Sequence, residues 1–98
     1  MDTQITPQPV RVGAAMVRLE LRDLSGQPLS GAHILVEGNM THPGMKPEFG
    51  EAKEVEPGRY QAPLEFTMAG DWLLIYHVTL QSGEKLEPQV EVKGVRAN

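Results

Sequence analysis

The chain contains no cysteine among its 98 residues. This absence excludes disulfides, thiolate nucleophiles and every metal site built on thiolate ligands, blue-copper electron-transfer centres included. Any metal ion would have to be held by Met, His or carboxylate side chains. Zinc is disfavoured too, because structural zinc sites use Cys, His and carboxylate ligands, for which a thioether is a poor substitute.

Long apolar runs are also missing. The longest uninterrupted run, from Trp72 to Tyr76, has five residues, whereas a membrane-spanning helix needs about 20. The first residues, MDTQITPQP, are polar and lack the apolar segment of a signal peptide. We therefore expect membrane attachment only through an anchor that is not present in this chain.

Positive charge is scarce, with 9 basic against 13 acidic residues and a net charge of −4. Because affinity for nucleic acid rests on Lys and Arg side chains that neutralise phosphates, a nucleic-acid partner is not expected. The sequence also has no phosphate-binding glycine loop, no zinc-protease motif, no calcium-loop spacing of acids and no evident pair of nucleophile and base. We expect the chain not to be an enzyme.

What the sequence does contain is a β pattern. Apolar residues alternate with mostly polar ones over 14–23, which predicts a strand with one face on a core. The apolar positions are Ala15, Val17, Leu19 and Leu21. The same reasoning predicts further strands at 32–37, 60–66, 72–80 and 86–92, and weaker ones near 9–12 and 50–55. The segment 38–51 is predicted to be mostly a long loop.

These segments predict an all-β fold, an Ig-like antiparallel β-sandwich of about seven short strands. Residues 1–98 then form a single domain with a polar N-terminal tail, 1–8, and a short C-terminal tail, 94–98. Pro63 predicts an edge position for its strand, since proline cannot donate to a sheet ladder. The run that begins at Trp72 is apolar on both faces and predicts a central strand, with Trp72 itself buried in the core.

Three stretches together resemble a known family. They read LRDLSGQPLSGAHILVEGNM, HPGM and EPGRYQAPLEFTMAGDWLLIYHV, and the resemblance as a whole runs from about Val17 to Val78. The chain is identified as similar to the YtkA-like/FixH-like domain family, small extracytoplasmic sandwiches found in bacterial copper-handling and oxidase-assembly contexts. The resemblance implies a periplasmic or cell-surface location, with any signal or anchor outside this chain, and a methionine-rich loop at 40–45.

That loop places Met40, His42 and Met45 within six residues. Thioether sulfur is a soft, neutral ligand that favours Cu(I), and imidazole suits copper, so this set predicts a copper site. Residues i and i+2 of an extended segment share one side, and the turn dipeptide Pro43-Gly44 can bring Met45 back toward them. The alternative is an exposed loop that contacts a partner protein or a membrane surface without metal.

Three residues elsewhere are candidate ligands. Met68 would supply a fourth ligand if its turn lies at the same end of the sandwich as the loop. The alternative is that Met68 plugs the sandwich end beside Trp72, as methionine commonly does. His77 and His33 are weaker candidates, and the alternative for each is a histidine that points to solvent or bonds to a neighbouring strand.

Two functions remain open on the sequence alone. The first is an extracytoplasmic copper-binding domain, with Cu(I) the favoured ion, that passes metal to or from a partner protein as a metallochaperone or in copper homeostasis. The second is a metal-free Ig-like interaction module of an efflux or oxidase-assembly system.

Overall fold

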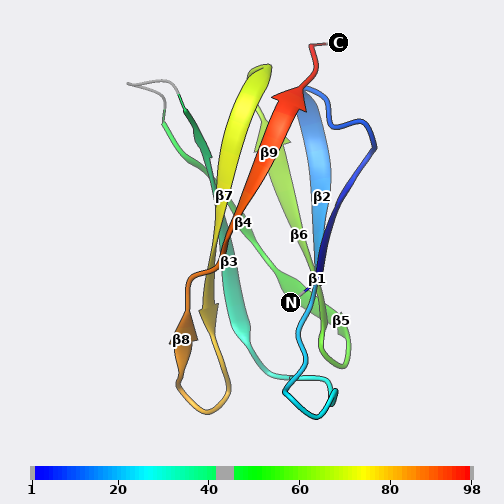
Figure 1. Ribbon diagram of the computed structural model, residues 1–98, viewed down its shortest axis with the longest axis vertical. Coiled ribbons are helices and arrows are strands. Elements are labelled where there is room, and N and C mark those ends of the chain that lie inside the picture. Colours follow the sequence, from blue (N-terminus) through cyan, green and yellow to red (C-terminus); the bar gives the residue numbers. More distant parts are fainter. Residues whose placement is uncertain (1, 42–45, 98) are drawn as a thin grey trace.

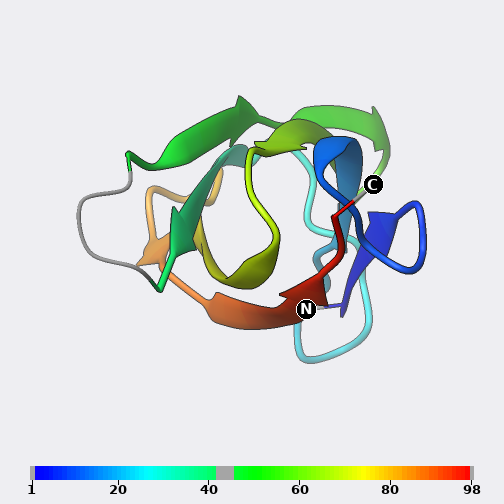
Figure 2. The ribbon, with the colours of Figure 1, turned by 90° about the horizontal axis from the view of Figure 1, so that it is seen from above.

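The computed structural model describes residues 2–41 and 46–97, and over these ranges the chain is all-β, without a helix. Nine strands form two antiparallel sheets that face each other as a sandwich (Figures 1 and 2). The first sheet has the order β1 (Asp2–Thr6), β2 (Gly13–Glu20), β6 (Arg59–Phe66), β5 (Lys53–Glu56). The second has the order β4 (Glu48–Glu51), β3 (His33–Met40), β7 (Gly70–Thr79), and β8 (Lys85–Leu86) and β9 (Gln89–Val95) both pair with β7. The predicted fold class is confirmed, with two more strands than expected.

The core lies between the two sheets, and strand alternation decides which side chains enter it. In β2 Val17 and Leu19 are buried while Arg18 between them is exposed. The largest buried side chains are Trp72, Tyr60, Tyr76 and Phe66. The predicted central position of the strand that begins near Trp72 is confirmed, because β7 has β3 on one side and β8 and β9 on the other.

The chain crosses between the sheets on both lateral sides of the sandwich. On one side β1 pairs with β2, and residues 10–12 then bond to the second sheet: Val12 N donates to Arg96 O (2.8 Å) and Arg96 N donates to Val10 O (2.9 Å). On the other side β4 belongs to the second sheet and β5 to the first, with Ala52 alone between them. These crossings partly cover what would otherwise be open edges.

Several predicted boundaries are wrong. Residues 2–6 form β1 rather than a tail, because they pair in register with β2 from Asp2↔Glu20 to Thr6↔Met16. The strand expected at 9–12 is reduced to one isolated bridge. At the other end of the chain β9 continues to Val95, so the expected C-terminal tail begins within a strand.

The predicted loop at 38–51 is partly formed by strands. β3 continues to Met40, and β4 begins at Glu48. Methionine 40 therefore belongs to a strand, where its side chain is set by sheet alternation and not by a loop.

The prediction from Pro63 that its strand lies at a sheet edge is wrong for β6 as a whole. Pro63 itself nevertheless has a paired strand on one side only. β6 lies between β2 and β5, but the β5 pairing reaches only as far as Gln61. At Pro63 the pairing within the sheet is with Met16 of β2 alone. A residue without an N–H is tolerated there because the neighbour on the other side has already ended.

The Glu54 side chain bonds to two turns at the end of the sandwich opposite the C-terminus of β3. Its carboxylate accepts hydrogen bonds from Gly31 N and Gly58 N, each at 3.0 Å. These two bonds stabilise the charged form and lower the pKa of Glu54 below its ordinary value of 4.5.

This lowered pKa predicts a pH-dependent contribution to stability. A carboxyl group whose pKa is lowered on folding stabilises the fold above its unfolded pKa, and that contribution is lost as the pH falls through the lower folded value. We expect Glu54→Gln to be less stable than the wild type near neutral pH, and the difference to shrink as the pH falls below 4.5. Urea-unfolding midpoints over a pH series measure this. Glu65→Gln, an exposed glutamate of β6, is the matched control, and a Glu54→Gln deficit that stays constant with pH would contradict the assignment.

Candidate metal site at the methionine end

Two of the predicted ligands lie at the same end of the sandwich. Met40 ends β3 directly opposite Trp72 of the antiparallel β7. Met68 lies in the turn that leads into β7, and its carbonyl accepts a hydrogen bond from Trp72 Nε1 at 2.9 Å. This end, at the top of Figure 1, is called the methionine end and is defined by Met40, Met68 and Trp72. The sequence left open which end Met68 occupies, and strand pairing answers it.

The two thioethers differ in exposure. Met40 is 9% exposed, whereas Met68 is 45% exposed. Met40 follows Ile34, Val36 and Gly38 on the inward side of β3, and a Cβ placed on Gly70 would come within 3.2 Å of its terminal methyl. The side chain buried beside Trp72 is therefore that of Met40, whereas Met68 is 45% exposed and does not fill this place.

Trp72 provides a rigid base for this end. The side chain is 1% exposed and makes an edge-to-face contact with Phe66, with ring centroids 5.1 Å apart and an interplanar angle of 85°. The predicted burial of Trp72 is confirmed. Since its indole N–H is bonded to the Met68 carbonyl, the backbone of the Met68 turn is held against the core while the residue stays partly exposed.

His42 and Met45, the other two members of the predicted set, lie outside the described residues. Their neighbours in the chain are described: Thr41 N donates to Asp71 O at 3.3 Å, and β4 begins at Glu48. The described part of the site therefore consists of the two methionines around Trp72.

The two weaker candidates lie elsewhere. The register of β3 with β7 places His77 opposite Leu35 and His33 opposite Thr79. Leu35 precedes Met40 by five residues, which corresponds to about 17 Å along a strand. The structure therefore does not bring either histidine to the methionine end.

His77 instead lies between two carboxylates. Its Nε2 is 2.8 Å from Glu37 Oε1 and its Nδ1 is 3.1 Å from Glu87 Oε2. Hydrogen bonds from Asn39 and then from His77 lower the pKa of Glu37. Both ring nitrogens are thus engaged with carboxylates, and residues 2–41 and 46–97 contain no group of three or more His, Asp and Glu side chains that could hold a metal ion.

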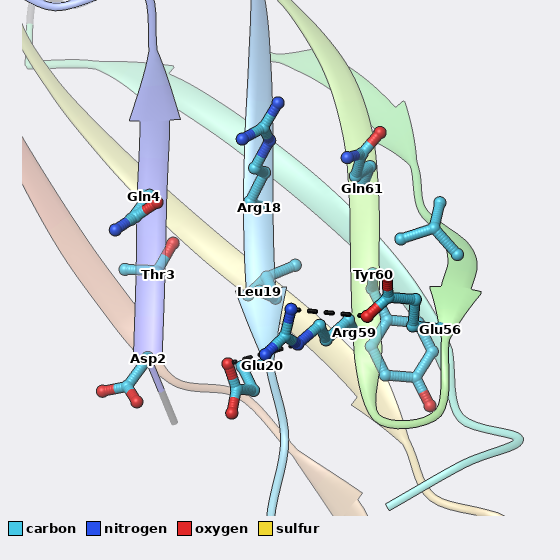
Figure 3. Close-up of a pocket in the computed structure, with 11 residues that line it drawn as sticks. Asp2, Thr3, Gln4, Arg18, Leu19, Glu20, Glu56, Arg59, Tyr60 and Gln61 are labelled. Carbon is cyan, nitrogen blue, oxygen red and sulfur yellow. Dashed lines mark ion pairs between the residues drawn. The ribbon is translucent and has the colours of Figure 1, made fainter. Parts of the chain in front are cut away.

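A groove on the outer face of the first sheet is a further candidate for binding (Figure 3). Three of its charged side chains pair with one another, because Arg59 lies 3.7 Å from Glu20 and 3.3 Å from Glu56. Asp2 and Arg18 line the groove as well. Because charges of both signs line it, the groove has no cluster of one sign with which to select a ligand.

The family comparison matches residues 2–77 with the family described as YtkA-like, which covers most of the chain. The chain belongs to the YtkA-like family. The resemblance noted from the sequence is confirmed, and the methionine end of this YtkA-like domain lies within the matched residues. Comparisons with curated proteins and with solved structures gave no match. No helix in the described part of this YtkA-like domain is long and apolar enough to cross a membrane.

One sequence pattern that could have indicated a binding surface is the distribution of Lys and Arg. The strands that became β3, β4 and β7 contain no Lys or Arg, yet they carry apolar residues on both faces. These strands expose two large apolar side chains, with Phe49 55% and Leu35 39% exposed.

Proposed function

We propose that this YtkA-like domain is an extracytoplasmic copper-binding domain that carries Cu(I) as cargo and exchanges it with a partner protein. The observation that supports the proposal is the meeting of Met40 and Met68 at one end of the sandwich around Trp72. The segment that holds His42 and Met45 leaves β3 from this same end, directly after Met40. The described structure provides two thioether groups at this end, and the proposal adds His42 and Met45, which follow Met40 in the sequence.

The donor types fit Cu(I) better than other ions. Thioether sulfur is soft and uncharged, and a Met and His set without thiolate favours copper over zinc, calcium or magnesium. The unequal burial of the two methionines suits transfer. Met40 would provide an inner ligand at the edge of the core, and the exposed Met68 would provide one that a partner's ligands can replace.

A second function is favoured by a different observation. The exposed Phe49 and Leu35 lie on the outer face of the second sheet, as expected of a protein-interaction module that works without metal. Under this alternative the methionines only close the sandwich, and the domain acts within an efflux or oxidase-assembly system through that face.

Competition for Cu(I) separates the two functions. The purified domain is titrated under reducing conditions against a chromophoric Cu(I) chelator, and the wild type is expected to withdraw the metal. Met68→Leu keeps the size of the side chain but removes the sulfur. It should weaken binding by at least about tenfold, equivalent to about 1.4 kcal/mol.

The other variants locate the ligands. Met45→Leu and His42→Ala are expected to weaken binding as Met68→Leu does. Met16→Leu, the same exchange on the outer side of β2, is the matched control and should bind as the wild type does. The copper proposal fails if the wild type does not compete with a weak chelator, or if Met68→Leu, Met45→Leu and His42→Ala all bind as tightly as Met16→Leu.

A further inference from the structure

The outer face of the second sheet carries an ordered set of acidic and apolar side chains. Strand register aligns two rows across β4, β3 and β7: Phe49–Glu37–Ile75 and Glu51–Leu35–His77. The residues that alternate with them, such as Val36 and Tyr76, are fully buried, so these six side chains lie on the outer side of the sheet. They are called the acidic–apolar face.

The apolar members of this face are exposed without a partner in the described chain. Phe49 is 55% exposed and Leu35 is 39% exposed, and Ile75 is half-buried between neighbouring side chains. Single exposed apolar residues are ordinary, but a contiguous group rimmed by charges is typical of an interaction site.

Among these six side chains the carboxylates are Glu37 and Glu51, and His77 lies between Glu37 and the neighbouring Glu87. The cationic Lys85 and Lys93 lie on β8 and β9, at the other edge of the same sheet. Strands β3, β4 and β7 contain no Lys or Arg. Glu51 has no ion pair with another described residue, and Glu87, beside His77, has a side chain 68% exposed. The outer face of the first sheet differs, because there Arg59 pairs with Glu20 and Glu56 (Figure 3).

We propose that the acidic–apolar face is a docking surface for a basic amphipathic segment of a partner protein. Lys or Arg side chains of the partner would lie against Glu51 and Glu87, and its apolar side chains against Phe49 and Leu35. A second copy of this chain would place carboxylates against carboxylates, and an anionic membrane surface would be repelled by the same charges. The small size of the face fits a weak, transient contact.

The proposal goes beyond copper binding and does not depend on it. The acidic–apolar face requires no metal, and its two rows cross β3 at Leu35 and Glu37, about 17 and 10 Å along the strand from Met40. None of the six residues of the face is among the four copper ligands proposed above.

A designed peptide tests this surface. The probe is a synthetic amphipathic helix of about 15 residues built from Leu and Lys, and the control peptide has Glu in place of every Lys. Binding is followed by NMR amide shifts of the labelled full chain. We expect shifts confined to β3, β4 and β7 with the Lys peptide and none with the Glu peptide.

Matched variants locate the contact. Phe49→Ser and Glu51→Lys should each raise the Kd for the Lys peptide by about fivefold or more. Val55→Ser replaces an apolar residue of similar exposure, 52%, on the other sheet, and Glu65→Lys reverses an exposed charge there. These two controls should leave the Kd unchanged. Leu35→Ser provides a second apolar variant if Phe49→Ser does not fold.

Three outcomes would overturn the proposal. The first is a pattern of shifts spread equally over both sheets, which would indicate attraction to net negative charge alone. The second is an equal effect of the Val55→Ser control and the Phe49→Ser variant. The third is concentration-dependent dimerisation of the free chain that Phe49→Ser abolishes, which would assign the face to a second copy.

Discussion

Gly50→Ala is expected to destabilise the domain by about 3 kcal/mol or more, a large part of the stability of a domain this size. A Cβ at Gly50 would lie 1.9 Å from Pro63 O and 3.0 Å from Pro63 C. Both atoms belong to the backbone of β6, so a rotamer change cannot relieve the clash. The strands themselves would have to separate.

The clash arises where the chain passes from one sheet to the other. Gly50 points inward from β4, opposite Val36, and Ala52 N then donates to Ile34 O (2.9 Å) before β5 joins the first sheet. The crossing brings β4 against β6 with no room for a side chain between them. Glycine is required here for close approach and not for a positive φ, since its backbone is extended like that of the rest of β4.

Urea unfolding measures the effect. Glu51→Ala, at the adjacent exposed position of the same strand, is the control and should change stability by no more than about 0.5 kcal/mol. If Gly50→Ala unfolds at the same urea concentration as Glu51→Ala, the close crossing of β4 over β6 is wrong.

Trp72→Ala is expected to cost about 4 kcal/mol, because it removes the largest buried side chain and leaves a cavity between the sheets. The variant loses the edge-to-face contact with Phe66 and the hydrogen bond to the Met68 carbonyl. It also removes the indole ring opposite Met40. The methionine end should therefore loosen along with the global loss of stability.

Two comparisons separate these effects. Trp72→Phe keeps an aromatic ring but loses the N–H donor, so it should be intermediate in stability and should leave the Met68 turn less ordered than in the wild type. Leu73→Ala, the next residue but on the outer side of β7, should cost less than Trp72→Ala. Urea unfolding and the NMR signals of the methionine methyl groups provide the measurements. A Trp72→Ala cost no larger than that of Leu73→Ala would contradict the assigned role of the indole.

Alternation was sufficient to predict most strands. Val17 and Leu19 on one side and Arg18 between them specify which face of β2 is buried, whatever strand lies next to it. The same pattern does not reveal β1, because DTQIT has a single strongly apolar residue, Ile5, and owes its strand conformation to its pairing with β2. Nor does it reveal that the acidic segment after residue 47 divides into two strands of different sheets.

For the candidate site, residue types supplied a chemical prediction, which stays a prediction, and strand pairing supplied the geometry of its described part. Residue types alone excluded thiolate sites and favoured copper for a set of Met and His residues. The sequence did not predict which methionine is buried. Met40 is buried because it falls on the inward-facing side of β3. Met68 lies in a turn whose position is fixed by the hydrogen bond from Trp72 Nε1 to the Met68 carbonyl, and this bond does not bury its side chain. The acidic–apolar face was missed for a similar reason, since Leu35 and Phe49 become neighbours only through the pairing of β3 with β4.

The sequence by itself determined the β-sandwich class, the buried Trp72, the absence of thiolate chemistry and membership of the YtkA-like family. These properties depend on residue type and on patterns within single segments. Only the tertiary structure decided that Met40 and Met68 share one end, that His33 and His77 lie elsewhere, and that one sheet face is acidic and apolar. Those properties depend on strand register between segments far apart in the chain, which local alternation does not encode.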